Sequence, residues 1–122
     1  MGAATALMCT AKLDPLVSCV IADSAFASLP MLVHDLLDEK VGSMLVDAAM
    51  GVVSRSVAYR AGFKISDVRV DAVAPVCPIL LVHGSEDNFV ALKHSQKLQQ
   101  AFKHTATLRV DDGGKHDSRR AR

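Results

Sequence analysis

The sequence predicts an α/β fold with about three parallel strands and flanking helices. Short apolar runs rich in β-branched residues alternate with helical segments along the chain. The run at 79–82 follows a proline and has no polar alternation, which is typical of a strand covered on both faces in a parallel sheet. The turn that follows this run carries an acid. Open α/β sheets place their ligands at the carboxyl ends of strands, so a site is expected there.

Length and composition fit one modest domain. Half of the 122 residues are hydrophobic, and the mean hydropathy is +0.24, which is apolar for so short a chain. Either most elements are buried, or the chain is part of a larger core. The net charge of +1 favours neither nucleic acid nor an anionic membrane surface as a partner. The arginines near the C-terminus are interpreted as a solvated tail.

Three cysteines, Cys9, Cys19 and Cys77, lie in apolar segments without a CxxC motif. Their odd number argues against a disulfide framework or a zinc site, so buried reduced thiols in a cytoplasmic protein are expected. The first residues lack the basic region of a signal peptide, and Ala6 stands where a myristoylation motif needs Ser or Thr. No apolar run reaches the length of a membrane span.

The first part of the chain predicts a helix, a strand and two more helices. Residues 2–12 are rich in alanine and favour a helix, although no N-cap residue precedes it. Residues 16–22 form an apolar, β-branched run and are expected to be a buried strand. Apolar residues recur at helical spacing over 29–37 and again over 41–59, which predicts two amphipathic helices. Residues 65–74 are expected to be an irregular connection.

After the strand at 79–82, a helix is expected over 90–102 with Asn88 as its N-cap. Its predicted inner face consists of Leu92, Leu98 and Phe102. Residues 105–110 are expected to be a third strand and 111–117 a loop, with a further helix starting at Ser118. Alternating strands and helices imply parallel pairing through right-handed crossovers.

Two strand-end loops carry the candidate chemistry. Asp87 follows the strand at 79–82, and His116 follows the strand at 105–110. An acid and a histidine at adjacent strand ends can meet, so that the carboxylate orients the imidazole and the imidazole acts as a general base. Gly113 and Gly114 give the loop the freedom to direct His116 back toward the acid. Such a pair needs a nucleophile, which in the order Ser, Asp, His would precede both on a sharp strand-to-helix turn.

These residues stand in a recognisable pattern. The segment HGSEDNFV at 83–90 resembles the HGxxDxxV element of α/β-hydrolases, and GGKHDS at 113–118 resembles the GxHxS element that carries their histidine. MGAATAL at 1–7 is similar to the residues that follow the nucleophile in the Gly-x-Ser-Met-Gly-Ala-Ala-Thr motif of the serine-aminopeptidase-like branch. The resemblance covers nearly the whole chain, as the C-terminal part of such a domain.

The resemblance implies a single partial α/β-hydrolase domain over 1–122, with a short helical cap insertion at 25–74. It implies Asp87 as the triad acid, His116 as the triad base, and the backbone N–H of Met1 in the oxyanion hole. The nucleophilic serine would directly precede Met1 and is absent from this chain. A departure from the family pattern is Ala91, where many relatives have proline.

The expected function is therefore serine-dependent hydrolysis of an ester, thioester or peptide bond in the complete enzyme, with this fragment inactive. The substrate would be a small molecule or a peptide or acyl compound, and no cofactor or metal is implied. The alternative is a non-catalytic interaction module derived from the same fold. The exposed edge of the first strand would then allow self-association.

Single residues also allow other interpretations. Asp87 or His116 alone could be an ordinary loop residue or helix cap. A metal site from Asp111, Asp112, His116 and Asp117 is less favoured, because no HExxH or similar ligand spacing accompanies them. The apolar stripes between 28 and 59 fit a cap over an acyl pocket and an ordinary core about equally.

Other roles are expected for the remaining serines and histidines. Ser24 lacks the flanking glycines of a nucleophile turn, and Ser85 lies on the loop of the acid itself. His83 is expected to make a buried structural hydrogen bond. Surface positions are expected for His34, His94 and His104.

Overall fold

The structure, a computed structural model, describes residues 1–13 and 17–116. The chain divides into two compact units. Unit 1 contains Met1–Ala27 and Val70–Arg122, and unit 2 contains Ser28–Arg69. The expected turn at 14–15 and the expected helix from Ser118 lie outside the described residues.

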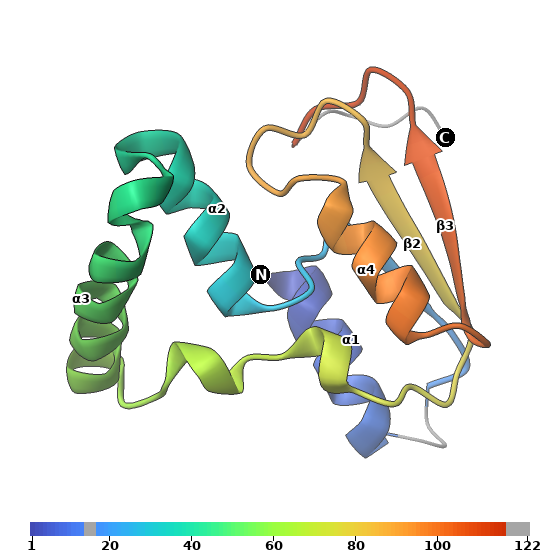
Figure 1. Cartoon of the computed structure of the whole chain (residues 1–122). Helices are drawn as coiled ribbons and strands as arrows, with labels where there is room; N and C mark the ends of the chain where they lie inside the picture. The colour runs from blue at the N-terminus through green and yellow to red at the C-terminus, as the bar shows by residue number, and fades with distance from the viewer. Residues whose placement is uncertain (14–16, 117–122) are drawn as a thin grey trace. The chain divides into compact units, whose positions relative to one another are not determined.

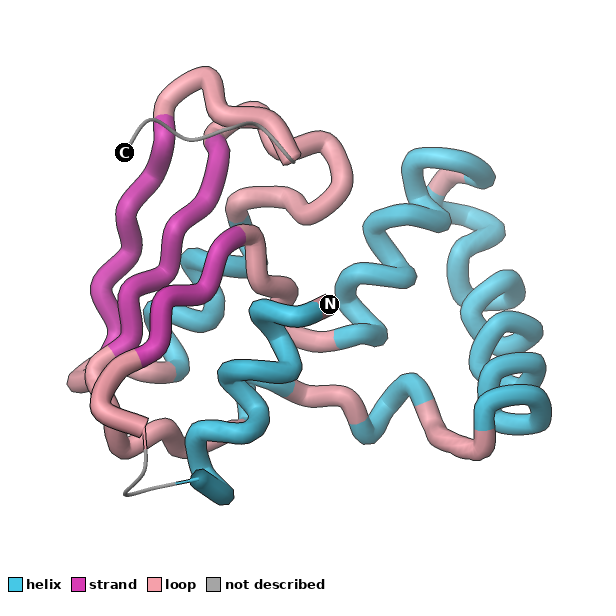
Figure 2. Tube along the Cα trace, turned by 180° about the vertical axis from the view of Figure 1, so that it is seen from behind, coloured by secondary structure: helices cyan, strands magenta, loops and turns pink. Residues whose placement is uncertain are grey.

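Unit 1 is built on a sheet of three parallel strands (Figures 1 and 2). The strands are β1 (Val20–Asp23), β2 (Ile79–Gly84) and β3 (Ala106–Asp111), and they pair in the order β1-β2-β3. Both pairings are parallel, which confirms the predicted fold class of about three parallel strands with flanking helices. The register places Gly84 opposite Asp111, so the loops that follow β2 and β3 start side by side.

Helices pack against this sheet. Helix α1 (Gly2–Leu13) lies against β1, and helix α4 (Lys93–Ala101) lies against β2 and β3. A short 3-10 helix, η2 (Val70–Ala72), contacts both α1 and α4. The centre of this packing includes Leu7, Leu81 and Leu98, which have no exposed surface. Burial of these side chains is the main stabilising term for the unit.

The expectation that β2 is covered on both faces is wrong for the described residues. Ile79, Leu81 and His83 are buried, whereas Leu80 and Val82 between them are only half-buried. Ile21, the neighbour of Leu80 on the edge strand β1, is 69% exposed. An apolar run specifies a surface that favours burial, but the run does not specify which element buries it.

Element boundaries differ from the prediction at β1 and α4. β1 begins at Val20 rather than at residue 16, and α4 begins at Lys93 rather than at residue 90. The N-cap of α4 is Leu92 without a side-chain hydrogen bond, so the predicted Asn88 cap is wrong. The backbone before α4 is instead organised by Asp87, the residue that precedes the predicted cap.

Unit 2 contains the two expected helices, α2 (Leu29–Val41) and α3 (Ser43–Ala61), which pack against each other. The hydroxyl of Ser28 accepts a hydrogen bond from the N–H of Met31 and so caps α2. Gly62 ends α3 with a φ of 72°, a conformation that favours glycine. A 3-10 helix, η1 (Ile65–Asp67), follows and contacts both helices.

The two ends of unit 2 are joined to each other. Ser28 and Arg69 form an isolated antiparallel bridge, and the N–H of Leu29 donates to the carbonyl of Val68 at 2.9 Å. The unit lies within the range 25–74 expected for the insertion, and its role as a cap stays a prediction. None of the helices in residues 1–13 and 17–116 combines the length and apolar character needed to cross a bilayer.

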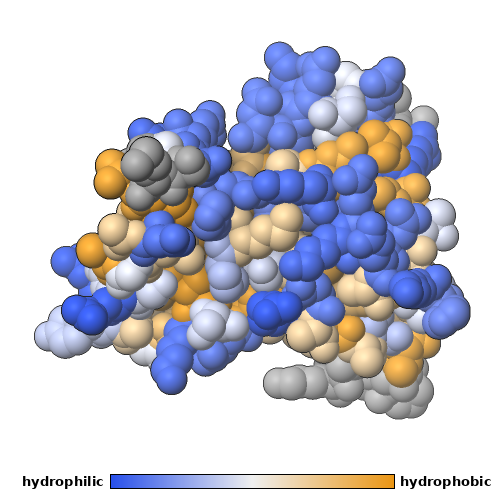
Figure 3. All heavy atoms as spheres, viewed as in Figure 1, coloured by the Kyte–Doolittle hydropathy of each residue, from blue (hydrophilic) through white to orange (hydrophobic). Residues whose placement is uncertain are grey.

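The surface mixes polar and apolar residues, as Figure 3 shows for one face. Large exposed apolar side chains in the described residues include Ile21, Val52, Tyr59 and Phe89. The three cysteines are free, but only Cys77 is buried. Cys19 is exposed because it directly precedes the edge strand β1, so the expectation that all three are buried is wrong.

Candidate active site

The structure brings Asp87 and His116 together at the carboxyl end of the sheet. Asp87 lies three residues beyond the end of β2, and His116 lies five residues beyond the end of β3. The Nδ1 atom of His116 is 2.8 Å from the Oδ2 atom of Asp87. The carboxylate can only accept, so His116 donates from Nδ1 and its proton position is set by this contact.

The carboxylate of Asp87 also organises its own loop. Its Oδ1 atom accepts hydrogen bonds from the N–H groups of Phe89 and Val90, both at 2.9 Å. The side chain of Asp87 has no exposed surface. Asp87 therefore holds the turn with one oxygen and presents the other oxygen to His116, which is the arrangement that orients an imidazole.

The hydrogen bonds of Asp87 outweigh its burial in setting its pKa. Burial alone would raise the pKa, because it disfavours the charged carboxylate. Hydrogen bonds from the His116 ring, from the N–H groups of Val90 and Phe89, and from the Ser24 side chain stabilise the charge. Together they lower the pKa of Asp87 from its ordinary value of 3.8 to about 2. The acid is therefore ionised at neutral pH and can stabilise a positive charge on His116.

This lowered pKa predicts an acid-dependent loss of stability. The carboxylate contributes its full stabilisation above pH 3.8, and the contribution is lost as the pH falls through about 2. The amount is up to about 2 kcal/mol in the free energy of unfolding. Denaturant titrations between pH 5 and 2 measure this effect. As the pH falls, the free energy of unfolding should decrease more steeply for the unmodified chain than for Asp87→Asn, which cannot titrate. The same dependence of the free energy of unfolding on pH in both proteins would contradict the lowered pKa of Asp87.

Backbone contacts join the two loops. The N–H of Ser85 donates to the carbonyl of Asp111 at 2.9 Å, and the N–H of Glu86 donates to the carbonyl of Gly114 at 2.9 Å. A Cβ atom on Gly84 would overlap with the carbonyl group of Gly114, so only glycine fits there. Gly113 has a φ of 70°, which a glycine adopts without strain. The two loops thus hold Asp87 and His116 at a fixed separation.

The second ring nitrogen of His116 has no hydrogen bond within residues 1–13 and 17–116. The His116 side chain is 36% exposed, so this nitrogen is accessible to another molecule or chain segment. The ring of Phe89 lies beside the ring of His116, and the two ring centroids are 5.1 Å apart. His116 therefore has one nitrogen fixed by Asp87 and one available for proton transfer.

No serine of the described chain is hydrogen-bonded to this histidine. The hydroxyl of Ser24 donates to Oδ1 of Asp23 at 3.1 Å, and the Ser24 side chain also interacts with the carboxylate of Asp87. The hydroxyl of Ser85 accepts from the N–H of Gly113 at 2.8 Å. Both hydroxyls thus contact the acid or the loops rather than the base.

Ser24 nevertheless has a feature that sequence patterns did not indicate. Its φ of 51° makes it the non-glycine residue with positive φ among the described residues. It directly follows β1, and its N–H donates to the carbonyl of Val82 at 2.9 Å. Strained backbone of this kind is often found at functional sites. Here it places a hydroxyl beside Asp87.

Met1 lies directly before helix α1, and its side chain is exposed. Its carbonyl accepts a hydrogen bond from the N–H of Thr5 at 3.0 Å. No described contact links Met1 to Asp87 or His116. The expected role of its N–H in an oxyanion hole stays a prediction.

Two histidines are fully buried, and the sequence predicted this for one of them. His83 is fully buried and hydrogen-bonded, as expected. The prediction of a surface position for His94 is wrong, because His94 is fully buried and its Nδ1 accepts a hydrogen bond from the N–H of Ala27 at 3.2 Å. The inner face of α4 contains polar residues, which a search for apolar spacing misses. His34 and His104 are exposed.

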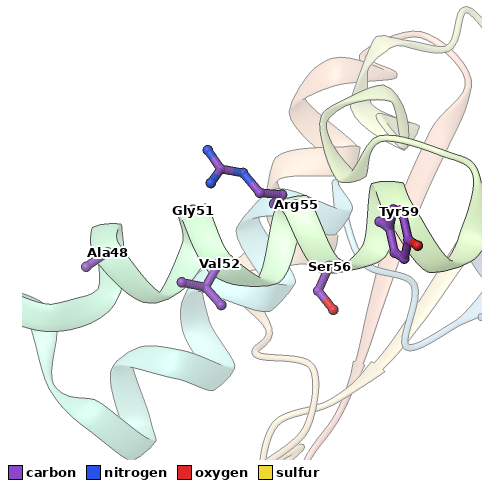
Figure 4. Close-up of a pocket in the computed structure, with 6 residues that line it drawn as sticks. All are labelled: Ala48, Gly51, Val52, Arg55, Ser56 and Tyr59. Atoms are coloured by element: carbon purple, nitrogen blue, oxygen red, sulfur yellow. The ribbon is translucent and has the colours of Figure 1, made fainter.

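A hollow on helix α3 in unit 2 lacks an acid–base pair (Figure 4). Its lining residues all belong to α3 and are Ala48, Gly51, Val52, Arg55, Ser56 and Tyr59. Within the described residues, no group of three or more His, Cys, Asp or Glu side chains could hold a metal ion. Asp117, one of the four residues of the alternative metal site, lies outside the described residues.

Comparisons with known proteins give fold similarity only. No protein-family profile matches the sequence, and no curated protein is detectably similar in sequence. An esterase domain from Rhodothermus marinus superposes with a TM-score of 0.62 and 19% identity over 94% of this chain and 49% of that chain. An esterase from Pyrococcus furiosus gives 0.55 and 19% over 93% and 42% of the two chains.

A third structure, an α/β hydrolase enzyme from a deep-sea metagenome library, gives a TM-score of 0.54 and 12% identity. It is matched over 93% of this chain and 55% of its own. The chain thus spans about half the length of the solved structures it matches. Together with the three parallel strands, these matches show that the chain has the fold of part of an α/β-hydrolase domain.

Proposed function

We propose that this chain is the acid–base half of a serine hydrolase of the serine-aminopeptidase-like branch. The observation that supports this most directly is the 2.8 Å contact between His116 Nδ1 and the buried Asp87 carboxylate at successive strand ends. Solved structures with the same fold include esterases, which is consistent with acyl-transfer chemistry. The substrate class would be an ester, a thioester or an amide.

The proposed mechanism assigns one task to each residue. A serine hydroxyl attacks the substrate carbonyl, and His116 takes the serine proton through its free ring nitrogen. Asp87 keeps the His116 proton on Nδ1 and stabilises the imidazolium that forms. His116 then returns the proton to the leaving group. No step of this mechanism needs a metal or cofactor.

The serine would come from outside residues 1–122, directly before Met1. Helix α1 packs against β1 and would be the helix that follows the nucleophile, so the Met1 N–H would contribute to the oxyanion hole. Within the described sheet, β1 pairs with β2 on one side only. A further strand carrying the serine could therefore pair with β1 on its open side.

The proposal is tested with residues 1–122 and two reagents. Neither hydrolysis of a chromogenic short-chain ester nor labelling by a fluorophosphonate probe is expected, because no described serine is hydrogen-bonded to His116. Ester turnover that His116→Ala abolishes would contradict the proposed inactivity. Covalent labelling of Ser24 would show that the nucleophile lies within this chain.

A second candidate is a non-catalytic module that binds through β1. The open side of β1 and the 69% exposure of Ile21 favour it, because unpaired strand edges readily pair with other chains. Sedimentation velocity of residues 1–122 at increasing concentration distinguishes the candidates. Concentration-dependent, saturable dimerisation that Ile21→Lys removes would favour the module, and a monomer at all concentrations would remove its support.

A further inference from the structure

His83 occupies a fully buried position at the end of β2 and is hydrogen-bonded through both ring nitrogens. Its Nδ1 atom is 2.6 Å from the hydroxyl oxygen of Ser95, and its Nε2 atom is 2.7 Å from the carbonyl oxygen of Val90. Ser95, in helix α4, is also fully buried. Buried polar groups held this tightly restrict the conformations available to the residues they join.

The partners of the ring determine where its proton lies. The carbonyl of Val90 can only accept, so Nε2 of His83 donates. The hydroxyl of Ser95 can donate to Nδ1, so that both ring nitrogens of His83 are hydrogen-bonded. The carbonyl of Val90 therefore sets the proton on Nε2, and the hydroxyl of Ser95 supports this arrangement by occupying Nδ1.

Val90 connects this network to the acid. Its N–H donates to Oδ1 of Asp87 at 2.9 Å, while its carbonyl accepts from His83. The Nε2 atom of His83 is also 3.7 Å from Oδ2 of Asp87, the oxygen that accepts from His116. Nε2 of His83, which donates to Val90, thus lies near the same carboxylate oxygen without a hydrogen bond to it. His83 therefore holds the loop around Asp87 through the carbonyl of Val90.

We propose that His83 is a positioning residue for the Asp87–His116 pair. Held on its Nδ1 side by Ser95, it fixes Val90 so that Asp87 presents Oδ2 to His116. This inference rests on the proposed function, since positioning matters for catalysis only if the pair is the acid and base of a hydrolase.

The experiment measures the pKa of Asp87 by carboxyl ¹³C NMR in residues 1–122, with Asp87→Asn to assign the signal. His83→Asn lacks a donor that reaches Val90, so the pKa of Asp87 should rise from about 2 toward 3.8. His83→Gln places an amide N–H near the position of Nε2 and should restore the low value. His104→Asn, a change at an exposed histidine, should leave it unchanged.

A merely structural His83 would lower the thermal midpoint without moving the Asp87 titration, and that result would overturn the inference. If His83→Asn does not fold, Ser95→Ala decides the question. It removes the hydroxyl that holds the Nδ1 side of the His83 ring, and an unchanged Asp87 titration in this variant would also overturn the inference.

His116→Ala separates this inference from the proposed function. If the pKa of Asp87 does not respond to His116→Ala, the pair itself is not formed and both ideas fail. If it responds to His116→Ala but not to His83→Asn or Ser95→Ala, only the positioning role fails.

Discussion

Replacing Asp87 with asparagine is expected to lower kcat by about 10⁴-fold in a longer chain that joins these residues to a serine nucleophile. Asparagine can keep the acceptor for the N–H groups of Phe89 and Val90, but it presents an NH₂ group to His116. Because this NH₂ group donates, Nδ1 of His116 would accept and the ring proton would lie on Nε2. The Nε2 atom could then not act as a base. Steady-state hydrolysis of a chromogenic ester measures the loss.

Asp87→Ala provides the contrast in stability. It removes both backbone hydrogen bonds of the loop and should reduce the free energy of unfolding by roughly 1–3 kcal/mol, whereas Asp87→Asn should cost less. The two variants should lose similar activity but different stability. An asparagine variant with more than a tenth of the original kcat would show that Asp87 does not orient the base.

Replacing Gly84 with alanine is expected to reduce the free energy of unfolding of residues 1–122 by roughly 1–3 kcal/mol. The added Cβ would overlap with the carbonyl oxygen and carbon of Gly114, which are backbone atoms and cannot move independently of the loop. Separating the two loops should also lengthen the contact between Asp87 and His116. Urea denaturation measures the loss, and the carboxyl titration of Asp87 reports on the contact.

Gly2→Ala is the matched control within the same unit. A Cβ atom at Gly2 meets nothing within 4 Å, so its effect should be smaller than about 1 kcal/mol and of stabilising sign. Equal destabilisation by the two variants would show that the close approach of the loops does not contribute to stability. A Gly84→Ala variant that is destabilised but keeps the Asp87 titration would show that the pair tolerates loop movement.

The sequence was sufficient to predict features that depend on local pattern. Alternating apolar runs and helical stripes predicted the parallel sheet and the two helices of unit 2. The order of strands placed Asp87 and His116 at neighbouring strand ends, where they meet. These predictions succeeded because periodicity and strand order constrain which residues share a face or an edge.

Other features were decided only by tertiary structure. The half-open face of β2 and the exposure of Cys19 depend on which elements cover the sheet, and an apolar run does not contain that information. His94 is buried, and its Nδ1 is satisfied by the N–H of Ala27, which lies 67 residues away in sequence. Polar residues on an inner helix face have no signature in hydropathy, since their burial depends on partners supplied by distant segments.

The sequence by itself therefore predicted the fold class and the meeting of Asp87 with His116 at neighbouring strand ends. Tertiary structure decided the contacts around these two residues. Gly84 lies directly against Gly114, and His83 is hydrogen-bonded between Ser95 and Val90. The physical reason is the separation in sequence of the residues that make each feature. Apolar runs and helical periods are patterns within a few residues, whereas hydrogen bonds and steric contacts at the site join segments that only folding brings together.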